Sequence, residues 1–306
     1  MNNNNVNGIL NILKPPGMTS HDVVSFVRKT LHIKKVGHAG TLDPGAAGVL
    51  PIFVGDATRV IEYNASADKT YRVHMKFGIQ TDSGDDSGKV ITSSPITSFD
   101  DSFLENALLA HTGLIEQVPP MYSAIKVNGQ KLCDLARKGV EVERKSRLIR
   151  VNSIKLIKRY YDTLHLEVNC SKGTYIRTLI EDIALHLNNH ATMTFLLRTK
   201  VGQFDINDAI TLEDFSSNPT AFLLPMNRAI EHLPKINVVY NQAIRITQGV
   251  ATTVQEALEH NFTAETVFSV CFQEQILGIA KLQDNRVKPI KILCKPNDNN
   301  SGLDLL

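Results

Sequence analysis

The 306-residue sequence predicts an α+β fold, and three patterns support this prediction. Lys69–Phe77 alternates apolar and polar side chains, which is typical of a strand with one buried face. Residues 176–187 place Ile176, Leu179, Ile180 and Ile183 at helical spacing on one face. Strands and helices are mixed without a regular βαβ repeat, which favours α+β over a doubly wound parallel sheet.

Turn and helix-cap residues divide the first third of the chain into its expected elements. Residues 8–13 predict a strand that ends at the turn Lys14-Pro15-Pro16-Gly17. Thr19 or Ser20 can cap the helix that follows, since apolar residues then recur on one face. A glycine-rich loop comes next, and a buried strand is expected at residues 50–54, before the strand Lys69–Phe77.

Further along, residues 82–88 form an acidic loop and a helix is expected after Ser98. A strand at 122–127 should end at an Asn128-Gly129 turn, with a short basic helix behind it. A strand at 164–170 precedes the helix at 176–187. From about residue 233 short β-rich runs dominate, at 237–240, 267–272, 276–282 and 289–294. These runs predict a first domain at 1–232 and a small β domain at 233–306.

Charge is informative only locally. The net charge is +2, so overall charge does not indicate a nucleic-acid partner. Residues 126–150 carry eight cations against three acids, an excess of five: Lys126, Lys131, Arg137, Lys138, Arg144, Lys145, Arg147 and Arg150 against Asp134, Glu141 and Glu143. A solvated surface explains part of this bias, but the bias also suits a phosphate backbone.

Several functional classes find no support in the sequence. The four cysteines lie far apart without a metal-ligand spacing, so neither zinc nor a disulfide framework is expected. Phosphate-binding and dinucleotide-binding glycine motifs are both missing. No signal peptide and no apolar run of membrane-spanning length is present. We therefore expect a cytoplasmic protein that binds no membrane, metal or nucleotide cofactor.

Asp43 is the most informative residue. It is the only carboxylate between Asp22 and Asp56, and it follows a run of cations and lies among glycines. Nearby positive charge favours an ionised carboxylate, and glycines let the backbone come close to a bulky ligand. This pattern suits a nucleophile or base that meets an anionic substrate. The alternative is an ordinary Asp-Pro turn.

The residues around Asp43 resemble the G-H-x-G-x-L-D-P-x-A-x-G-V-L-P signature of the TruB-type tRNA pseudouridine synthases. The matched positions are Gly37, His38, Gly40, Leu42, Asp43, Pro44, Ala46, Gly48, Val49, Leu50 and Pro51. The resemblance implies a pseudouridine-synthase fold, with a mixed, largely antiparallel sheet flanked by helices and a small C-terminal PUA-like domain. It implies isomerisation of uridine 55 in the T-loop of tRNA, a reaction without a cofactor.

The resemblance also implies catalytic roles. Asp43 would be the catalytic carboxylate, and Tyr71, in Lys-Thr-Tyr-Arg-Val, would be the active-site tyrosine. Arg177, in a K-G-T-Y-I-R segment, would form an ion pair with Asp43. Two alternatives are open: Tyr71 as a core residue of an amphipathic strand, and Arg177 in a surface pair with Glu181.

The resemblance also implies that further residues bind RNA. His38 would occupy the space that the flipped uridine leaves, and Lys14 and Pro15 match a pair near the active site. Leu197 would line the uracil pocket, although a core role is an alternative. The run Pro-Pro-Met-Tyr-Ser-Ala-Ile-Lys resembles the start of an insertion, about 119–150, that clamps the T-arm with cations such as Lys126 and Lys131.

The implied partner is therefore the T-arm stem-loop of tRNA, bound by a monomer without an obligatory protein partner. Two rival functions use the same scaffold. One is a non-catalytic RNA-binding or tRNA-folding protein, because a fold alone does not establish activity. The other is a pseudouridine synthase that acts on another RNA, such as a guide-dependent relative acting on ribosomal RNA.

Overall fold

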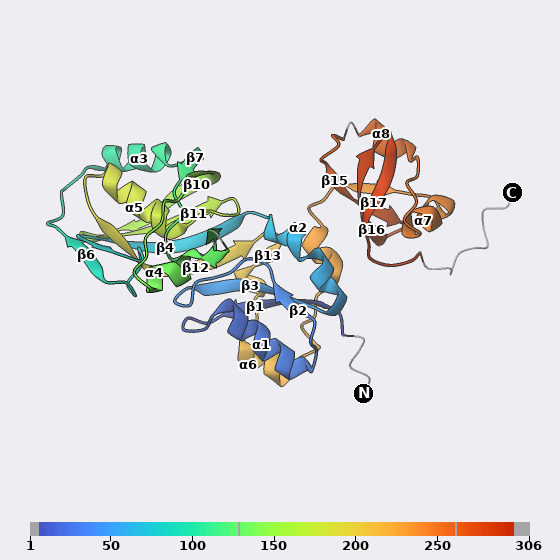
Figure 1. The fold of residues 1–306 in the computed structure, drawn as a ribbon, viewed down its shortest axis with the longest axis horizontal. Helices are drawn as coiled ribbons and strands as arrows, with labels where there is room; N and C mark the ends of the chain where they lie inside the picture. The colour runs from blue at the N-terminus through green and yellow to red at the C-terminus, as the bar shows by residue number, and fades with distance from the viewer. Residues whose placement is uncertain (1–5, 128, 261, 297–306) are drawn as a thin grey trace. The chain divides into compact units, whose positions relative to one another are not determined.

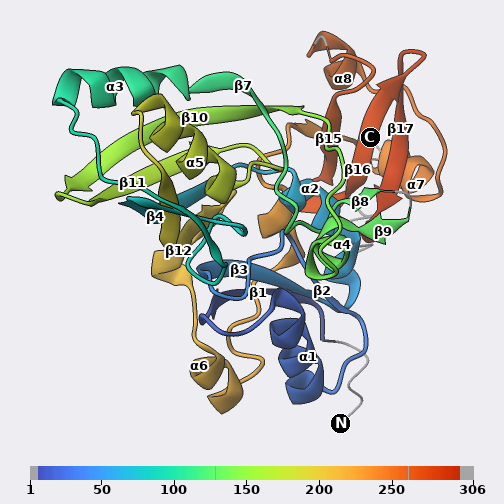
Figure 2. The ribbon, with the colours of Figure 1, turned by 60° about the vertical axis from the view of Figure 1, so that its left-hand side comes forward.

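The computed structural model describes residues 6–127, 129–260 and 262–296. The chain divides into two compact units, Met1–Met226 and Asn227–Leu306 (Figures 1 and 2). This division lies a few residues before the boundary predicted at 232/233. Each unit has its own sheet and its own hydrophobic core.

A mixed sheet forms the centre of the larger unit, as predicted. Its strands lie in the order β1 (Gly8–Lys14), β3 (Ala47–Val54), β12 (Ala191–Val201), β4 (Lys69–Phe77), β11 (Thr163–Cys170), β10 (Arg147–Arg159) and β7 (Gly113–Gln117). β2 (Val36–His38) pairs with β3, and β13 (Phe204–Asp205) with β12. All these pairings are antiparallel except that of β12 with β3. The predicted α+β class is confirmed.

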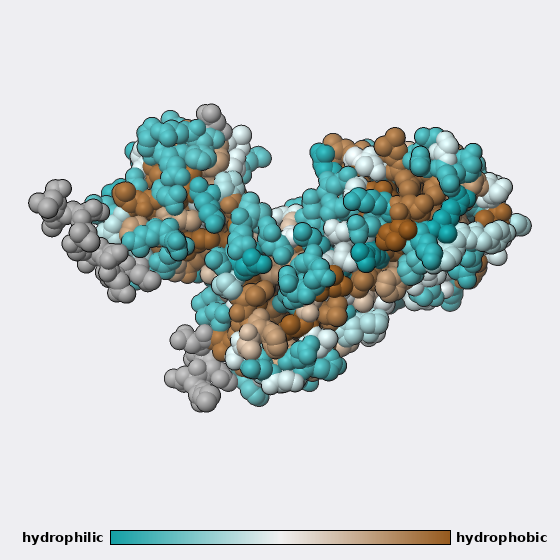
Figure 3. Space-filling view, turned by 180° about the vertical axis from the view of Figure 1, so that it is seen from behind, coloured by the Kyte–Doolittle hydropathy of each residue, from teal (hydrophilic) through white to brown (hydrophobic). Residues whose placement is uncertain are grey.

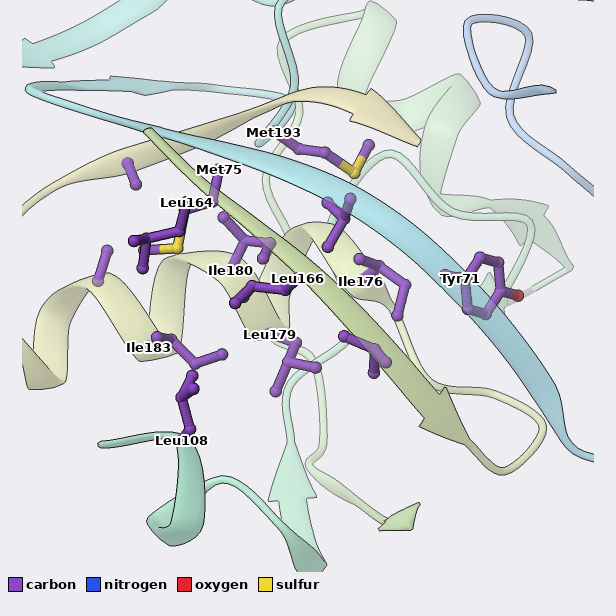
Figure 4. Close-up of a cluster of buried hydrophobic side chains, with 14 of the residues drawn as sticks. Tyr71, Met75, Leu108, Leu164, Leu166, Ile176, Leu179, Ile180, Ile183 and Met193 are labelled. Atoms are coloured by element: carbon purple, nitrogen blue, oxygen red, sulfur yellow. The ribbon is translucent and has the colours of Figure 1, made fainter. Parts of the chain in front are cut away.

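One face of this sheet packs against α3 (Asp101–Ala110) and α5 (Ile176–His186). Every second residue of β4, from Tyr71 to Phe77, points into the cluster that these helices close. Leu179 and Ile183 of α5 fill its centre (Figure 4). The alternation along β4 and the helical spacing along α5 therefore meet in one core, as their periodicities predict.

A second core lies at the other end of the sheet. Here α1 (Ser20–Leu31) and α6 (Leu212–Ser217) pack against β1 and β3. Thr19 caps α1: its side chain accepts from the Asp22 amide, and Asp22 accepts in return from the Thr19 amide. This cap fixes the start of α1 next to the turn at Lys14, and it confirms one of the two caps predicted. The remaining short elements are η2 (Gly55–Val60), α2 (Ile61–Ala65), β5 (Ile79–Thr81), β6 (Val90–Ser93), η3 (Ile206–Asp208) and η4 (Met226–Ile230).

The basic insertion differs from its prediction. Only Lys126–Val127 (β8) of the expected strand at 122–127 is a strand, and it pairs with β9 (Gln130–Lys131). The preceding carbonyls of Ser123 and Ile125 accept instead from amides at the start of α4 (Leu132–Arg137). Asn128 of the predicted turn lies outside the described residues, and Gly129 has a φ of 82°.

The smaller unit is β-rich, as predicted. Its sheet has the order β14 (Lys235–Asn237), β15 (Val267–Phe272), β16 (Gln275–Gln283) and β17 (Arg286–Ile292). Two short helices, α7 (Tyr240–Thr247) and α8 (Gln255–Glu259), complete its core. The strand predicted at 237–240 was wrong except at Asn237, because β14 ends there and the Gln242 side chain caps the Val239 amide at the start of α7. Among the described residues, no helix is long and apolar enough to cross a membrane.

Candidate active site

Asp43 lies in the loop between β2 and β3, with the backbone on both sides of it held in place. The Ser20 hydroxyl, at the start of α1, accepts from the Leu42 amide at 2.9 Å and donates to the Leu42 carbonyl at 3.2 Å. On the other side, Lys14 Nζ donates to the Pro44 carbonyl at 3.2 Å. The carboxylate itself is 41% exposed. The loop is thus fixed while its acid faces solvent.

Lys14 is fully buried and has no hydrogen left for substrate. Its ammonium also donates to the carbonyls of Pro15 at 2.9 Å and Met18 at 2.6 Å, so all three of its hydrogens bind backbone. Burial lowers its pKa to about 8, against the opposing effect of the Asp43 carboxylate. We conclude that Lys14 orders the Asp43 loop.

Arg198, in β12, holds the same loop from the sheet. Its buried guanidinium donates to the carbonyls of Val49 at 2.8 Å, Gly40 at 3.0 Å and Thr41 at 3.4 Å. β3 approaches β12 so closely that a Cβ on Gly48 would lie 2.1 Å from the Arg198 carbonyl oxygen. Gly48 also has a φ of 117°, which side chains rarely allow. The signature glycine is therefore required by packing.

Arg177 forms the predicted ion pair with Asp43. The distance from Arg177 Nη2 to Asp43 Oδ2 is 3.2 Å. Its guanidinium also donates to the carbonyls of Ser83 and Tyr122, each at 2.8 Å. The side chain is only 6% exposed, so the alternative of a surface pair with Glu181 does not describe it. Because the guanidinium is held at several points, it presents a fixed charge to Asp43.

A second carboxylate, which was not predicted from the sequence, lies at this arginine. Asp85 Oδ2 lies 3.7 Å from Arg177 Nη1. The Ser83 hydroxyl donates to Asp85 at 2.7 Å, and the Ser87 amide donates to it at 3.1 Å. The sequence shows that loop 82–88 is acidic. It does not show that the loop lies beside Arg177, because the bridge between Asp85 and Met193 of β12 places it there.

Tyr71 closes the site from β4. It lies at one end of the aliphatic cluster, with its hydroxyl pointing away from the cluster (Figure 4). Its register partner on β12 is Arg198. Burial raises the pKa of Tyr71, and the Arg198 guanidinium opposes that rise. The phenol is therefore neutral at pH 7 and can donate a proton or a hydrogen bond.

The structure does not bring Leu197 to this group. Leu197 pairs with Arg72 of β4, whereas Leu196 pairs with Val73 and lies in the core cluster with Tyr71. Successive residues of a strand point to opposite faces, so Leu196 is the residue of this pair on the Tyr71 face. The prediction named the neighbouring residue.

The other predicted RNA-binding residues lie on three separate segments of the larger unit. His38 ends β2, and burial lowers its pKa, so the imidazole is neutral at pH 7; its Nδ1 is buried with no hydrogen-bond partner within the described residues. Pro15 is half-buried in the turn after β1. Lys126 and Lys131 are exposed and face each other across the β8–β9 hairpin. The insertion that carries them contacts the site directly, since Tyr122 accepts from Arg177.

The described ranges contain no group of three or more His, Cys, Asp or Glu side chains that could hold a metal ion. Asp43, Tyr71 and the two arginines are ionisable side chains gathered at this site. A carboxylate open to solvent, a neutral phenol and fixed cations can act on an anionic substrate by nucleophilic or base catalysis.

Comparison with known proteins assigns this combination of fold and site to the pseudouridine synthases. The model "TruB family pseudouridylate synthase (N terminal domain)" matches residues 28–176, and "tRNA pseudouridylate synthase B C-terminal domain" matches residues 177–231. A protein of Alkaliphilus oremlandii named "tRNA pseudouridine synthase B" is 42% identical, over 94% of this chain and 98% of its own length. A protein of the same name in Symbiobacterium thermophilum is 46% identical, over 82% of this chain and 84% of its own length. The chain belongs to the TruB family and is a pseudouridine synthase.

Solved structures agree on the fold. "Crystal Structure of a Cbf5-Nop10-Gar1 Complex" includes a chain with a TM-score of 0.74 and 25% identity, covering 94% of this chain and 85% of the other. "Structure of H/ACA RNP bound to a substrate RNA containing 2'-deoxyuridine" includes a chain with a TM-score of 0.73 and 24% identity. The match covers 95% of this chain and 86% of the other. The mixed sheet flanked by helices and the small C-terminal PUA-like domain are thus both confirmed.

Proposed function

We propose that the enzyme converts uridine 55 in the T-loop of tRNA to pseudouridine, with Asp43 as nucleophile or base. One observation carries this proposal: Asp43, on a loop held by Ser20, Lys14 and Arg198, forms an ion pair with Arg177 of α5. The relatives named for tRNA support the substrate class. The resemblance of residues 37–51 to the TruB signature supports the position.

The reaction is an isomerisation whose atoms balance without a co-reactant. The bond from ribose C1′ to uracil N1 breaks, the base turns over, and C1′ joins C5. The C5 proton leaves and N1 gains a proton, so nothing is oxidised or reduced. Asp43 attacks the base, attacks C1′, or removes a sugar proton; each of these roles requires an ionised carboxylate within reach of the nucleoside. The proposed chemistry uses no cofactor and no metal.

The neighbours of Asp43 have separable roles in this proposal. Arg177 holds the carboxylate oxygen that it contacts, so that the other oxygen is free for the nucleoside. Tyr71 stacks on the flipped base, and its neutral phenol relays the C5 proton. Leu196, on the same face as Tyr71, supplies an apolar wall for the uracil in place of Leu197.

RNA binding in this proposal uses the basic insertion and His38. Lys126 and Lys131 contact phosphates of the T-arm, and the neutral His38 imidazole stacks where uridine 55 leaves the loop. Because Tyr122 accepts from Arg177, the root of the insertion is part of the catalytic group. RNA bound by the insertion is thereby placed beside Asp43. The partner is the tRNA T-arm, bound by a monomer.

The test is a synthetic T-arm hairpin incubated with the enzyme after dialysis against EDTA, followed by mapping of pseudouridine at each position. The proposal predicts modification at position 55 alone and no requirement for added metal or nucleotide. Modification elsewhere in the hairpin would contradict the position. Hairpin binding and tRNA folding without any pseudouridine would favour the RNA-folding alternative.

A further inference from the structure

The face of the large sheet opposite Tyr71 carries a cluster of aromatic rings. His74 of β4 stacks on His165 of β11, with centroids 3.6 Å apart and planes 8° from parallel. Phe195 of β12 lies 4.7 Å from His74, and Tyr160, just after β10, lies 5.1 Å from His165. Three segments, β4, the β10–β11 hairpin and β12, thus assemble one continuous row of rings.

These rings share a face because of strand register. His74 pairs with His165 on one side and with Phe195 on the other. The neighbouring residue of β4, Val73, points to the core, so His74 points away from it. Phe195 is 41% exposed and Tyr160 is 45% exposed, so the row is open to solvent at both ends. We call His74, His165, Phe195 and Tyr160 the aromatic row.

The surroundings of the aromatic row are basic. Lys158 Nζ lies 4.8 Å from the centroid of the Tyr160 ring. Other exposed cations on the same face are Arg72, Lys76 and Lys155. Glu167 is the only carboxylate in β4, β10, β11 and β12, all of whose residues the structure describes, and it is 3.5 Å from Arg72. Positive charge therefore exceeds negative charge along the row.

On the face of the larger unit that Figure 3 shows, hydrophobic and hydrophilic side chains both reach the surface. Burial lowers the pKa of His74 and the second imidazole adds to that effect, so the ring is uncharged at pH 7. Flat aromatic rings flanked by cations match a ligand with bases to stack and phosphates to neutralise.

We propose that the aromatic row is a second RNA-binding surface, which takes a single-stranded segment by base stacking. The bases stack on Phe195 and Tyr160 at the exposed ends, while Lys158 and Arg72 contact the phosphates. The site lies on the opposite face of β4 from Tyr71, so it binds RNA independently of the uridine at Asp43. Recognition by stacking does not depend on base identity.

The test uses the full-length enzyme and a fluorescein-labelled oligoadenylate of about ten nucleotides, the scale of a single-stranded site. This probe contains no uridine and cannot be a substrate. We expect salt-dependent binding by fluorescence anisotropy. Phe195→Ala and Tyr160→Ala should each weaken it about tenfold, because each removes one stacking ring.

Tyr161→Ala is the matched control, since Tyr161 adjoins Tyr160, is 87% exposed, and has no ring contact among the described residues. Phe195→Leu retains apolar volume but not the flat ring, so it should weaken binding even if Phe195→Ala unfolds. Pseudouridine formation in a T-arm hairpin should be unchanged in every variant. That readout separates this inference from the proposed function.

Equal oligoadenylate affinity in wild type, Phe195→Leu and Tyr160→Ala would overturn the proposal. It would also be overturned if Tyr161→Ala weakened binding as much as Tyr160→Ala did. Competition by polyglutamate as strong as by unlabelled oligoadenylate, with no effect of the ring variants, would show a purely electrostatic surface. Ultraviolet cross-linking of the probe to Tyr160 or Phe195 would support the proposal directly.

Discussion

Arg177 lies between two carboxylates: its guanidinium is 3.2 Å from Asp43 and 3.7 Å from Asp85. Asp43 is the more exposed of the two, and Asp85 is held by Ser83 and Ser87. Asp85 therefore anchors the arginine, and the arginine in turn orients the acid that faces substrate. The ion pair of Arg177 and Asp43 is thus completed by a residue from a loop that the sequence presents only as an acidic turn.

Asp85→Asn should lower the rate of pseudouridine formation by about tenfold or more, the effect of losing ~1.4 kcal/mol of orientation. The amide keeps the shape but removes one of the two charges that hold Arg177. Single-turnover measurements with saturating T-arm hairpin would show the loss. Asp86→Asn is the control, because Asp86 is exposed in the same loop and should leave the rate unchanged. Equal rates for both variants would contradict the anchoring role.

Gly48→Ala should destabilise the larger unit by more than about 2 kcal/mol. The new Cβ would lie 2.1 Å from the Arg198 carbonyl oxygen at a φ of 117°. Gly45→Ala, in the same signature, should stay within about 0.5 kcal/mol of wild type, because no atom lies within 4 Å of its added Cβ. Urea unfolding monitored by circular dichroism measures both. Similar midpoints for the two variants would refute the packing argument.

The raised pKa of Glu181 predicts that the stability of the fold depends on pH. Burial, with a smaller contribution from Asp182, raises its pKa from 4.5 to about 7, against the opposing effects of Arg177 and Arg144. The folded state thus holds the proton more tightly, so the contribution of Glu181 to stability is complete below pH 4.5 and is lost as pH rises to about 7.

Glu181→Gln removes this titration. The variant should match wild type near pH 4.5, gain relative stability between pH 4.5 and about 7, and keep a constant advantage above that range. Denaturant unfolding at a series of pH values gives the difference. If the free energies of unfolding of wild type and Glu181→Gln differed by the same amount at every pH, the pKa of Glu181 would not be raised.

Changing Lys126, Lys131 and Lys138 to Glu should weaken tRNA binding and flatten its salt dependence. Each lost phosphate contact removes about one unit from the slope of log affinity against log salt. Filter binding of tRNA at several salt concentrations measures the slope. Changing the same three lysines to Arg keeps the charge and should leave the affinity and the slope unchanged. Identical slopes for wild type and the insertion variant would place the T-arm elsewhere.

Local patterns predicted the parts of the fold in which one face is buried and the other is not. β4 has the predicted bounds because Tyr71, Val73, Met75 and Phe77 alternate with polar residues. β10 and β12 were missed, since two register shifts in each interrupt the alternation that marks a strand. Their place in the sheet is set by pairing with distant strands, which a single sequence does not display.

The site, like the fold, combines residues of one continuous sequence motif with residues that only tertiary contacts bring together. Asp43 and its glycines form one continuous motif, so they could be found from sequence. Asp85 and Arg198 reach the site only through tertiary contacts. Leu197 was chosen in place of Leu196, and in a strand a slip of one residue moves a side chain to the other face.

The most direct test of the central claim is single-turnover pseudouridine formation at position 55 by Asp43→Asn, with tRNA affinity measured in parallel. The amide keeps the shape of the side chain but cannot act as nucleophile or base. We expect no detectable pseudouridine and a tRNA affinity close to that of wild type, because phosphate contacts supply most of the binding energy. Appreciable pseudouridine formation by Asp43→Asn would contradict the assignment of Asp43 as the catalytic residue.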